Sequence, residues 1–261
     1  MKKQNQTTAL SFLTSVTTSA FYKINVQKKN FSLVLCALVS MAACGGSDVG
    51  ALATAGTTSS ATPSAGSKNF KAEVWADNWF SLYVGDAYVG EDSVPITTER
   101  SFNSETLSFN ASYPFDLNFI IKDFKQNDTG LEYIGTSKQQ IGDGGFIAQI
   151  KDTSSGKVVA VSSKAFKCKV IHKAPLIPSC LKLANPTVTS CGANILAEPA
   201  GWKSRGFDTS SWEFATVYSA AEVGVKDGYF DIAWHAAAKL IWTSDLKLDN
   251  TLLCKYTVTG S

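Results

Sequence analysis

Hydrophobic and polar side chains alternate along most of the chain beyond residue 70. Between Phe80 and Val84 every second side chain is apolar, and Gly85-Asp86 then supplies a hairpin turn signal. A period of two is the pattern of a strand with one buried face. The same period predicts further strands at Leu107–Ala111, Phe115–Ile121, Phe146–Ile150, Phe166–Val170 and Leu252–Val258.

Helical patterns are scarce in the same region. Residues 219–223 allow a single helical turn, whereas residues 172–201 contain four prolines and two cysteines and indicate a long loop. Many short strands separated by glycine and asparagine turns are typical of a sandwich. We therefore expect residues 69–261 to form an all-β, antiparallel β-sandwich, with 172–201 as a disulfide-pinned excursion.

The first 43 residues have the organisation of an export signal. Lysines at 23, 28 and 29 precede an uncharged apolar run, Phe31–Ala43, which is too short to span a bilayer comfortably. The sequence LVSMAAC resembles a bacterial lipobox, although Met41 stands where leucine is usual. It predicts cleavage before Cys44 and lipid attachment to that cysteine. The alternative is ordinary signal cleavage that leaves Cys44 as a thiol.

Residues 44–68 predict a flexible tether between the lipid and the domain. They are rich in glycine, serine, alanine and threonine, so they bury too little apolar surface to fold. Glycine rather than aspartate follows Cys44, and by resemblance to lipoprotein sorting signals this favours the outer membrane.

The charge distribution gives no reason to expect nucleic acid as a partner. Residues 1–43 hold five lysines and no acidic residue, so 19 of the 24 basic residues remain beside 22 acidic ones. The folded part is therefore slightly acidic, and a basic surface for phosphate contacts is not expected.

Four cysteines remain after Cys44: Cys168, Cys180, Cys191 and Cys254. An even number in an exported chain predicts two disulfides, for which three connectivities exist. We favour Cys180–Cys191, which closes a short loop, and Cys168–Cys254, which joins two predicted strands. Free buried thiols are the alternative.

Three phrases of the sequence resemble galactose-binding-like jelly-roll domains. They are Val74–Gly85 (VWADNWFSLYVG), Gly206–Trp212 (GFDTSSW) and Ala238–Trp242 followed by Asp249-Asn250. The resemblance implies a jelly-roll fold and the binding of sugars or polymers by a non-catalytic module. Ligand residues differ among members of that superfamily, so it assigns none here.

The tryptophans supply candidate ligand contacts. Trp79, Trp202 and Trp234 lie beside turns with polar neighbours, and Arg205 follows the second of them. Exposed aromatic faces stack on sugar rings, while nearby polar groups bond the hydroxyls. Core packing is the alternative for each ring, and we expect it for the other three tryptophans.

Motifs of common enzyme classes are missing, which favours a non-catalytic role. The expected function is the binding of carbohydrate or another extracellular polymer by a lipid-anchored envelope protein. Two alternatives remain, an adhesion module with a protein partner and a hydrolase with its site in 172–201. No cofactor is expected, although Asp86, Glu91 and Asp92 offer oxygen ligands that suit calcium.

Overall fold

The computed structural model describes residues 66–96 and 102–260. The described residues belong to one compact unit, Ser59–Ser261. The expected signal peptide, Cys44 and nearly all of the tether lie outside the described residues. Within the described ranges, no helix is long and apolar enough to cross a membrane.

The first of two large antiparallel sheets contains six strands. Its central strand β1 (Lys68–Asp77) pairs with β4 (Ser104–Ala111) on one side and β8 (Gly145–Asp152) on the other. The sheet is completed by β14 (Leu240–Trp242), which pairs with β8, by β13 (Thr216–Tyr218), which pairs with β14, and by β9 (Val158–Val161), which pairs with β8.

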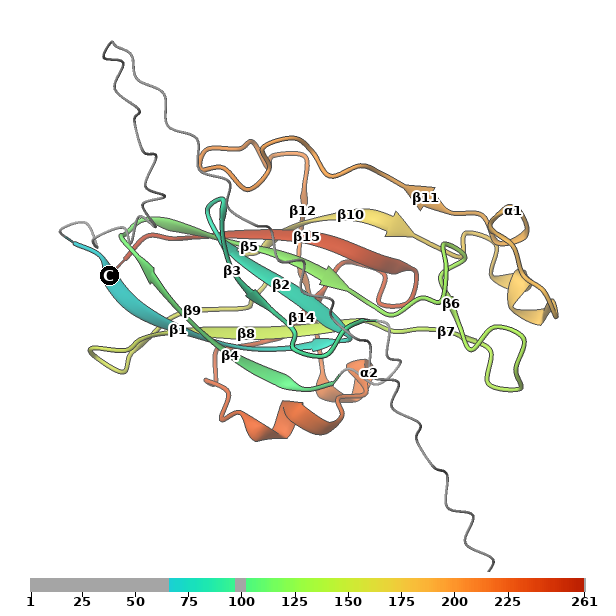
Figure 1. Cartoon of the computed structure of the whole chain (residues 1–261), viewed down its shortest axis with the longest axis horizontal. Coiled ribbons are helices and arrows are strands. Elements are labelled where there is room, and N and C mark those ends of the chain that lie inside the picture. Colours follow the sequence, from blue (N-terminus) through green and yellow to red (C-terminus); the bar gives the residue numbers. More distant parts are fainter. Residues whose placement is uncertain (1–65, 97–101, 261) are drawn as a thin grey trace, which may run out of the picture. The chain divides into compact units, whose positions relative to one another are not determined.

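The second sheet contains seven strands and lies against the first (Figure 1). In order its strands are β11 (Asn194–Ile195), β10 (Lys167–Lys173), β15 (Asp249–Val258), β5 (Phe115–Lys122), β2 (Trp79–Val84) and β3 (Ala87–Glu91), and β12 (Glu213–Phe214) also pairs with β10. A separate hairpin joins β6 (Leu131–Glu132) to β7 (Gln140–Ile141). The predicted all-β sandwich is therefore confirmed.

The main core fills the space between the two sheets. Alternate residues of β1 (Phe70, Ala72, Val74) face alternate residues of β5 and β15, which is the arrangement that the period of two predicts. Cys168 on β10 and Cys254 on β15 are directly opposite in the register, with their Cα atoms 4.2 Å apart, and form a disulfide within this core.

Two long chain segments cover parts of the outer faces of the sandwich and bury side chains on the far side of each sheet. Residues 196–214 lie over the second sheet, where Trp202 and Trp212 pack on Ile120 and Leu253. Residues 219–239 lie over the first sheet, where Val223 packs on Trp75. Figure 1 shows these orange segments on opposite sides of the molecule.

The single helical turn expected at 219–223 is present as α2 (Ala220–Val223). Ser219 caps it by accepting a hydrogen bond from the Glu222 amide, and the Glu222 carboxylate accepts from the Ser219 amide in return. This capping box satisfies amide groups that a short helix leaves unpaired, and Gly224 ends the turn in the left-handed conformation.

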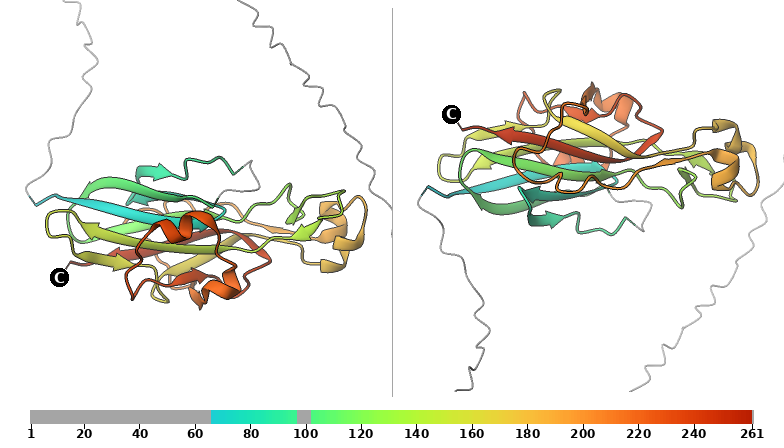
Figure 2. Two further views of the ribbon diagram at one scale, coloured as in Figure 1. Left: turned by 90° about the horizontal axis from the view of Figure 1, so that it is seen from below. Right: turned by 90° about the horizontal axis from the view of Figure 1, so that it is seen from above.

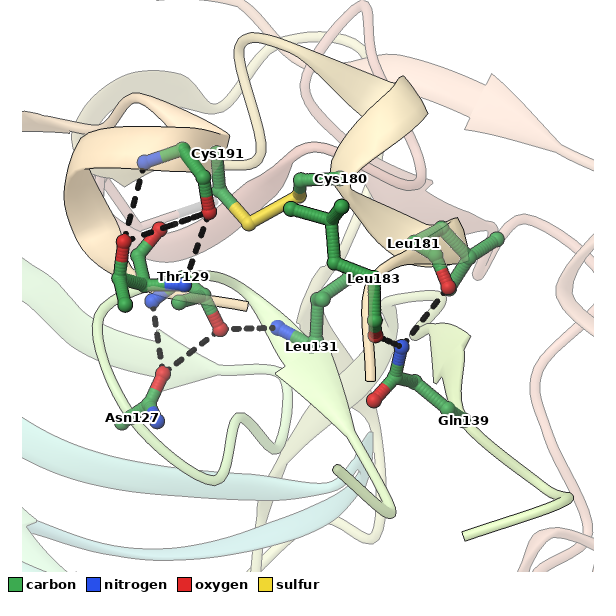
Figure 3. Close-up of a disulfide and its surroundings, with 10 residues drawn as sticks. Asn127, Thr129, Leu131, Gln139, Cys180, Leu181, Leu183 and Cys191 are labelled. Atoms are coloured by element: carbon green, nitrogen blue, oxygen red, sulfur yellow. Dashed lines mark hydrogen bonds between the residues drawn. A yellow bond between two sulfur atoms is a disulfide. The ribbon is translucent and has the colours of Figure 1, made fainter. Parts of the chain in front are cut away.

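The excursion after β10 forms a compact tip and is not an irregular loop. It contains a 3-10 turn, η1 (Pro178–Lys182), and a helical turn, α1 (Val188–Cys191), which the predicted Cys180–Cys191 disulfide joins. Both half-cystines pack on Leu131 of β6 (Figure 3). A Cβ at Gly130 would lie 2.3 Å from the Ala174 carbonyl oxygen, so only glycine allows this close approach.

Candidate functional site

A cavity of about 720 Å³ lies where β5 ends and the chain turns towards the β6–β7 hairpin. One wall comes from residues 122–126, which continue β5, and the other comes from Tyr133, Ile134 and Thr136 in the hairpin. Ile96 and Thr251 complete the lining. The volume lies within the range of about 300–1,000 Å³ that is usual for small-ligand sites.

The hairpin wall has a defined conformation. Gln126 joins the hairpin to the β5 side. Its side-chain oxygen accepts a hydrogen bond from the Ile134 backbone amide, and its backbone amide donates to the Leu131 carbonyl. Tyr133 has φ of 50°, which is uncommon for a residue with a bulky side chain. Thr136 holds this turn, since its amide and its hydroxyl both donate to the Tyr133 carbonyl. Backbone strain of this kind is concentrated at functional sites.

Two lysines supply positive charge at the cavity. The Lys122 ammonium lies 4.5 Å from the centre of the Trp79 ring, which is directly opposite in the β2–β5 register. Burial lowers the pKa of Lys122. The Lys125 ammonium lies 2.6 Å from the Asp128 carboxylate. The wall therefore combines aromatic area with cationic groups.

Carboxyl groups lie at and behind this wall, and one of them, Asp123, is part of the cavity lining. Burial is the main cause that raises the pKa of Asp123 well above its usual value, and the charges of Asp77, Glu132 and Asp143 raise it further. Burial likewise raises the pKa of Asp77 to about 7, while Lys226, 3.5 Å from its carboxylate, opposes the shift. Both carboxyl oxygens of Asp123 are buried without a hydrogen-bond partner. A neutral, protonated Asp123 is the form that such surroundings favour.

The expected tryptophan contacts do not form one site. Trp79 and Trp202 belong to the same cluster on the outer face of the second sheet, whereas Trp234 lies with Tyr229 on the outer face of the first. Trp234 is half-buried, and its indole donates to the Tyr229 carbonyl. These two faces point in opposite directions, so the three rings do not form one continuous binding surface for a ligand.

For Trp202 the expectation of an exposed ring is wrong. The side chain is 2% exposed because it packs on Trp212 and Ile120, and its indole donates to the Glu198 carboxylate at 3.0 Å. Only a hollow of about 280 Å³ adjoins it. Arg205 is exposed, and its guanidinium donates to the Pro114 carbonyl at 3.2 Å. Trp79 is half-buried beside Lys122 and is the predicted ring nearest the cavity.

The three acidic residues considered for calcium are not grouped. Asp86 lies in the β2–β3 turn, while Glu91 and Asp92 lie at the far end of β3. A five-residue strand separates them by roughly 16 Å at its usual rise, which is too far for one ion. Among the described residues, no three histidine, cysteine, aspartate or glutamate side chains are arranged to hold a metal ion.

Reasoning from the sequence missed the residues that line the cavity, chiefly Lys122, Lys125 and Tyr133. Tyr133 stands between two glycines, Gly130 and Gly135, in a stretch with no strand periodicity, and this was the available signal of a structured loop. The sequence gives no comparable indication for the lysines. The alternation on β5 predicts only that the Lys122 side chain points away from the core.

Comparison of the chain with protein-family models, with curated proteins and with solved structures found no match.

Proposed function

We propose that this protein binds an acidic polysaccharide and that the cavity beside β5 holds one of its sugar residues. The observation that carries the proposal is the composition of the cavity wall. Tyr133 offers a ring face, Lys122 and Lys125 offer positive charge, and Gln126 and Thr136 offer hydrogen-bonding groups. A sugar that carries a carboxylate needs these three kinds of contact.

The half-buried ring of Trp79 extends this surface along β2. It lies next to Lys122 and outside the cavity lining, so a second sugar residue of the same chain would reach it. Each aromatic contact contributes about 1 kcal/mol, so the affinity of a single domain should be weak. Several domains on one cell surface would bind a long polymer more tightly by avidity.

The proposal includes export and anchoring of the domain at the cell envelope. Two disulfides support export, because such bonds persist in oxidising compartments. Mass spectrometry of the membrane fraction tests whether a lipid is attached to Cys44. A mature N-terminus without an acylated cysteine would remove the anchor from the proposal and leave the binding site unaffected.

A hydrolase with its site inside the excursion has little support. Residues 172–201 contain one carboxylate, Glu198, and one histidine, His172. The excursion therefore lacks the carboxyl pair that most glycoside hydrolases use. Binding without cleavage is the activity that the cavity wall favours.

The binding test uses residues 59–261, which form a compact unit with their own core and both disulfides. Calorimetric titration with polygalacturonate as the acidic probe and dextran as the neutral one should give saturable heat for the former only. Tyr133→Asn should weaken binding at least about fivefold, because a ring contact is lost while asparagine tolerates the left-handed backbone.

The matched control is Tyr88→Ala, which removes a tyrosine that is 56% exposed on β3 and lies outside the cavity lining. It should leave the titration unchanged. Equal binding by the wild type and the Tyr133→Asn variant would rule out the cavity as the site. If no acidic polysaccharide binds at all, the alternative of a protein partner becomes the better one.

A further inference from the structure

Exposed aliphatic side chains are concentrated on the disulfide-pinned tip. Ten large hydrophobic residues are strongly exposed in the described part of the chain, and six of them lie within residues 176–196. Their exposed fractions lie between 43% and 54%. The six are Leu176, Ile177, Leu183, Val188, Ile195 and Leu196. Scattered single residues need no explanation, but a concentration of this kind indicates a contact surface.

The tip presents these side chains from a rigid base. Its inner side is already packed, because Cys180 and Cys191 contact Leu131. The backbone amide of Ile177 donates to the Cys191 carbonyl at 2.6 Å. The side-chain amide of Gln139 donates to the carbonyls of residues 181 and 183 (Figure 3). The outward aliphatic groups are therefore held in place, and their exposure does not result from a poorly packed loop.

The charged side chains of residues 174–197 and of the β6–β7 loop are lysines. Residues 174–197 contain one charged side chain, Lys182, and no acidic one. The β6–β7 loop that touches the tip through Gln139 adds Lys138, and it also has no acidic residue between positions 133 and 141. Both lysines are exposed. An apolar surface with a cationic border complements a membrane whose headgroups are anionic.

We propose that this tip docks on the surface of a lipid bilayer that contains anionic lipid. The aliphatic side chains would enter the boundary between headgroups and acyl chains, and Lys138 and Lys182 would contact phosphates. A protein partner fits less well, because protein interfaces depend on tryptophan, tyrosine and arginine, and residues 174–197 contain none of them.

The residues of this membrane contact differ from those that line the proposed sugar site, although both sets adjoin the β6–β7 hairpin. The tip lies at the end of the domain opposite to the C-terminus, whereas β1 begins near the C-terminus (Figures 1 and 2). Docking through the tip therefore does not depend on the tether, and the domain can be tested without it.

The test is cosedimentation of oxidised residues 59–261 with vesicles of phosphatidylcholine, alone or mixed with phosphatidylglycerol. The wild type should bind the mixed vesicles and bind them less well at high salt. A variant that combines Leu176→Ser, Ile177→Ser and Leu183→Ser should lose at least about tenfold in binding. Its near-ultraviolet circular dichroism should match the wild type, because the three side chains are exposed.

The matched control is Phe230→Ser, which removes a side chain that is 73% exposed on the segment over the first sheet. It should bind vesicles as the wild type does. Failure of the wild type to bind the mixed vesicles would overturn the proposal, as would equal binding by the triple variant. A dimer that the triple variant abolishes, without vesicle binding, would assign the tip to a second copy of the chain instead.

Discussion

The ammonium group of Lys255 lies 2.9 Å from the carboxylate of Asp116, and both side chains are buried. They face outward from adjacent strands of the second sheet, under the segment that covers it. Lys255 also donates to the carbonyl of Ser204 and to the side chain of Asn118, and Asp116 accepts from the hydroxyl of Thr257. This ion pair therefore attaches the covering segment to the sheet.

Removal of one partner should be costly. Lys255→Met leaves the Asp116 carboxylate buried without its counter-charge, so the free energy of unfolding should fall by about 3–5 kcal/mol in urea denaturation. The double variant Lys255→Met with Asp116→Leu should recover most of the loss, because no unpaired charge remains. A single variant as stable as the wild type would show that the pair is not buried in solution.

The two disulfides should differ in their contribution to stability. Cys168–Cys254 joins positions 86 residues apart and Cys180–Cys191 joins positions 11 apart. Restriction of the unfolded chain then amounts to about 4–5 kcal/mol for the first and about 3 kcal/mol for the second. Paired alanine variants, unfolded in urea, should lose stability in that order. The reverse order would mean that strain or residual structure outweighs chain entropy.

The tryptophans should separate into structural and ligand-binding groups. Trp202→Ala empties a site beneath Trp212 and should cost about 3–5 kcal/mol of stability. Trp79→Ala, at a half-buried position, should cost less stability and should weaken binding of polygalacturonate. Thermal unfolding and calorimetric titration of both variants decide the matter. Loss of binding in a stable Trp202→Ala protein would restore that ring as a ligand contact.

Asp77 should make the domain less stable as pH rises. Its carboxyl titrates near 3.8 in the unfolded chain and near 7 in the folded one. Between these values the unfolded state binds fewer protons, so the free energy of unfolding decreases with pH, by up to about 1.4 kcal/mol for each pH unit. The loss is complete above pH 7.

Asp77→Asn keeps the shape of the side chain and removes this titration. The stability difference, wild type minus variant, should therefore fall as urea denaturation is repeated from pH 4 to pH 8, while titrating groups that do not interact with Asp77 cancel. A difference that rises with pH would mean that the attraction of Lys226 outweighs burial.

The regular parts of the fold were predictable because their causes are local. The alternation at Phe80–Val84 and at Leu252–Val258 sets which side chains enter the core, and β2 and β15 occupy those residues. The capping interactions of α2 also join residues that are close together in the sequence. The disulfide partners followed from loop length and from strand periodicity, two properties that are visible in the chain itself.

The candidate site was not predictable to the same degree, because it depends on contacts between distant segments. Trp202 has polar neighbours in the sequence, yet Trp212 and the outer face of β5 bury it. The cavity joins β5 to a hairpin whose strands have two residues each, too short for periodicity to reveal. In the sequence Asp123 has no feature that distinguishes it from other acidic residues, and only the fold brings Asp77 close to it.

The Cys180–Cys191 ring is nested within the larger ring that Cys168–Cys254 closes. Any single cut of the backbone between residues 169 and 253 therefore leaves two pieces that remain covalently joined. A protease that reaches the protruding tip would produce a nicked molecule that has gained one water and separates into fragments only after reduction. Such a cut would interrupt the chain at the tip, while the Cys168–Cys254 bond would still join β10 to β15.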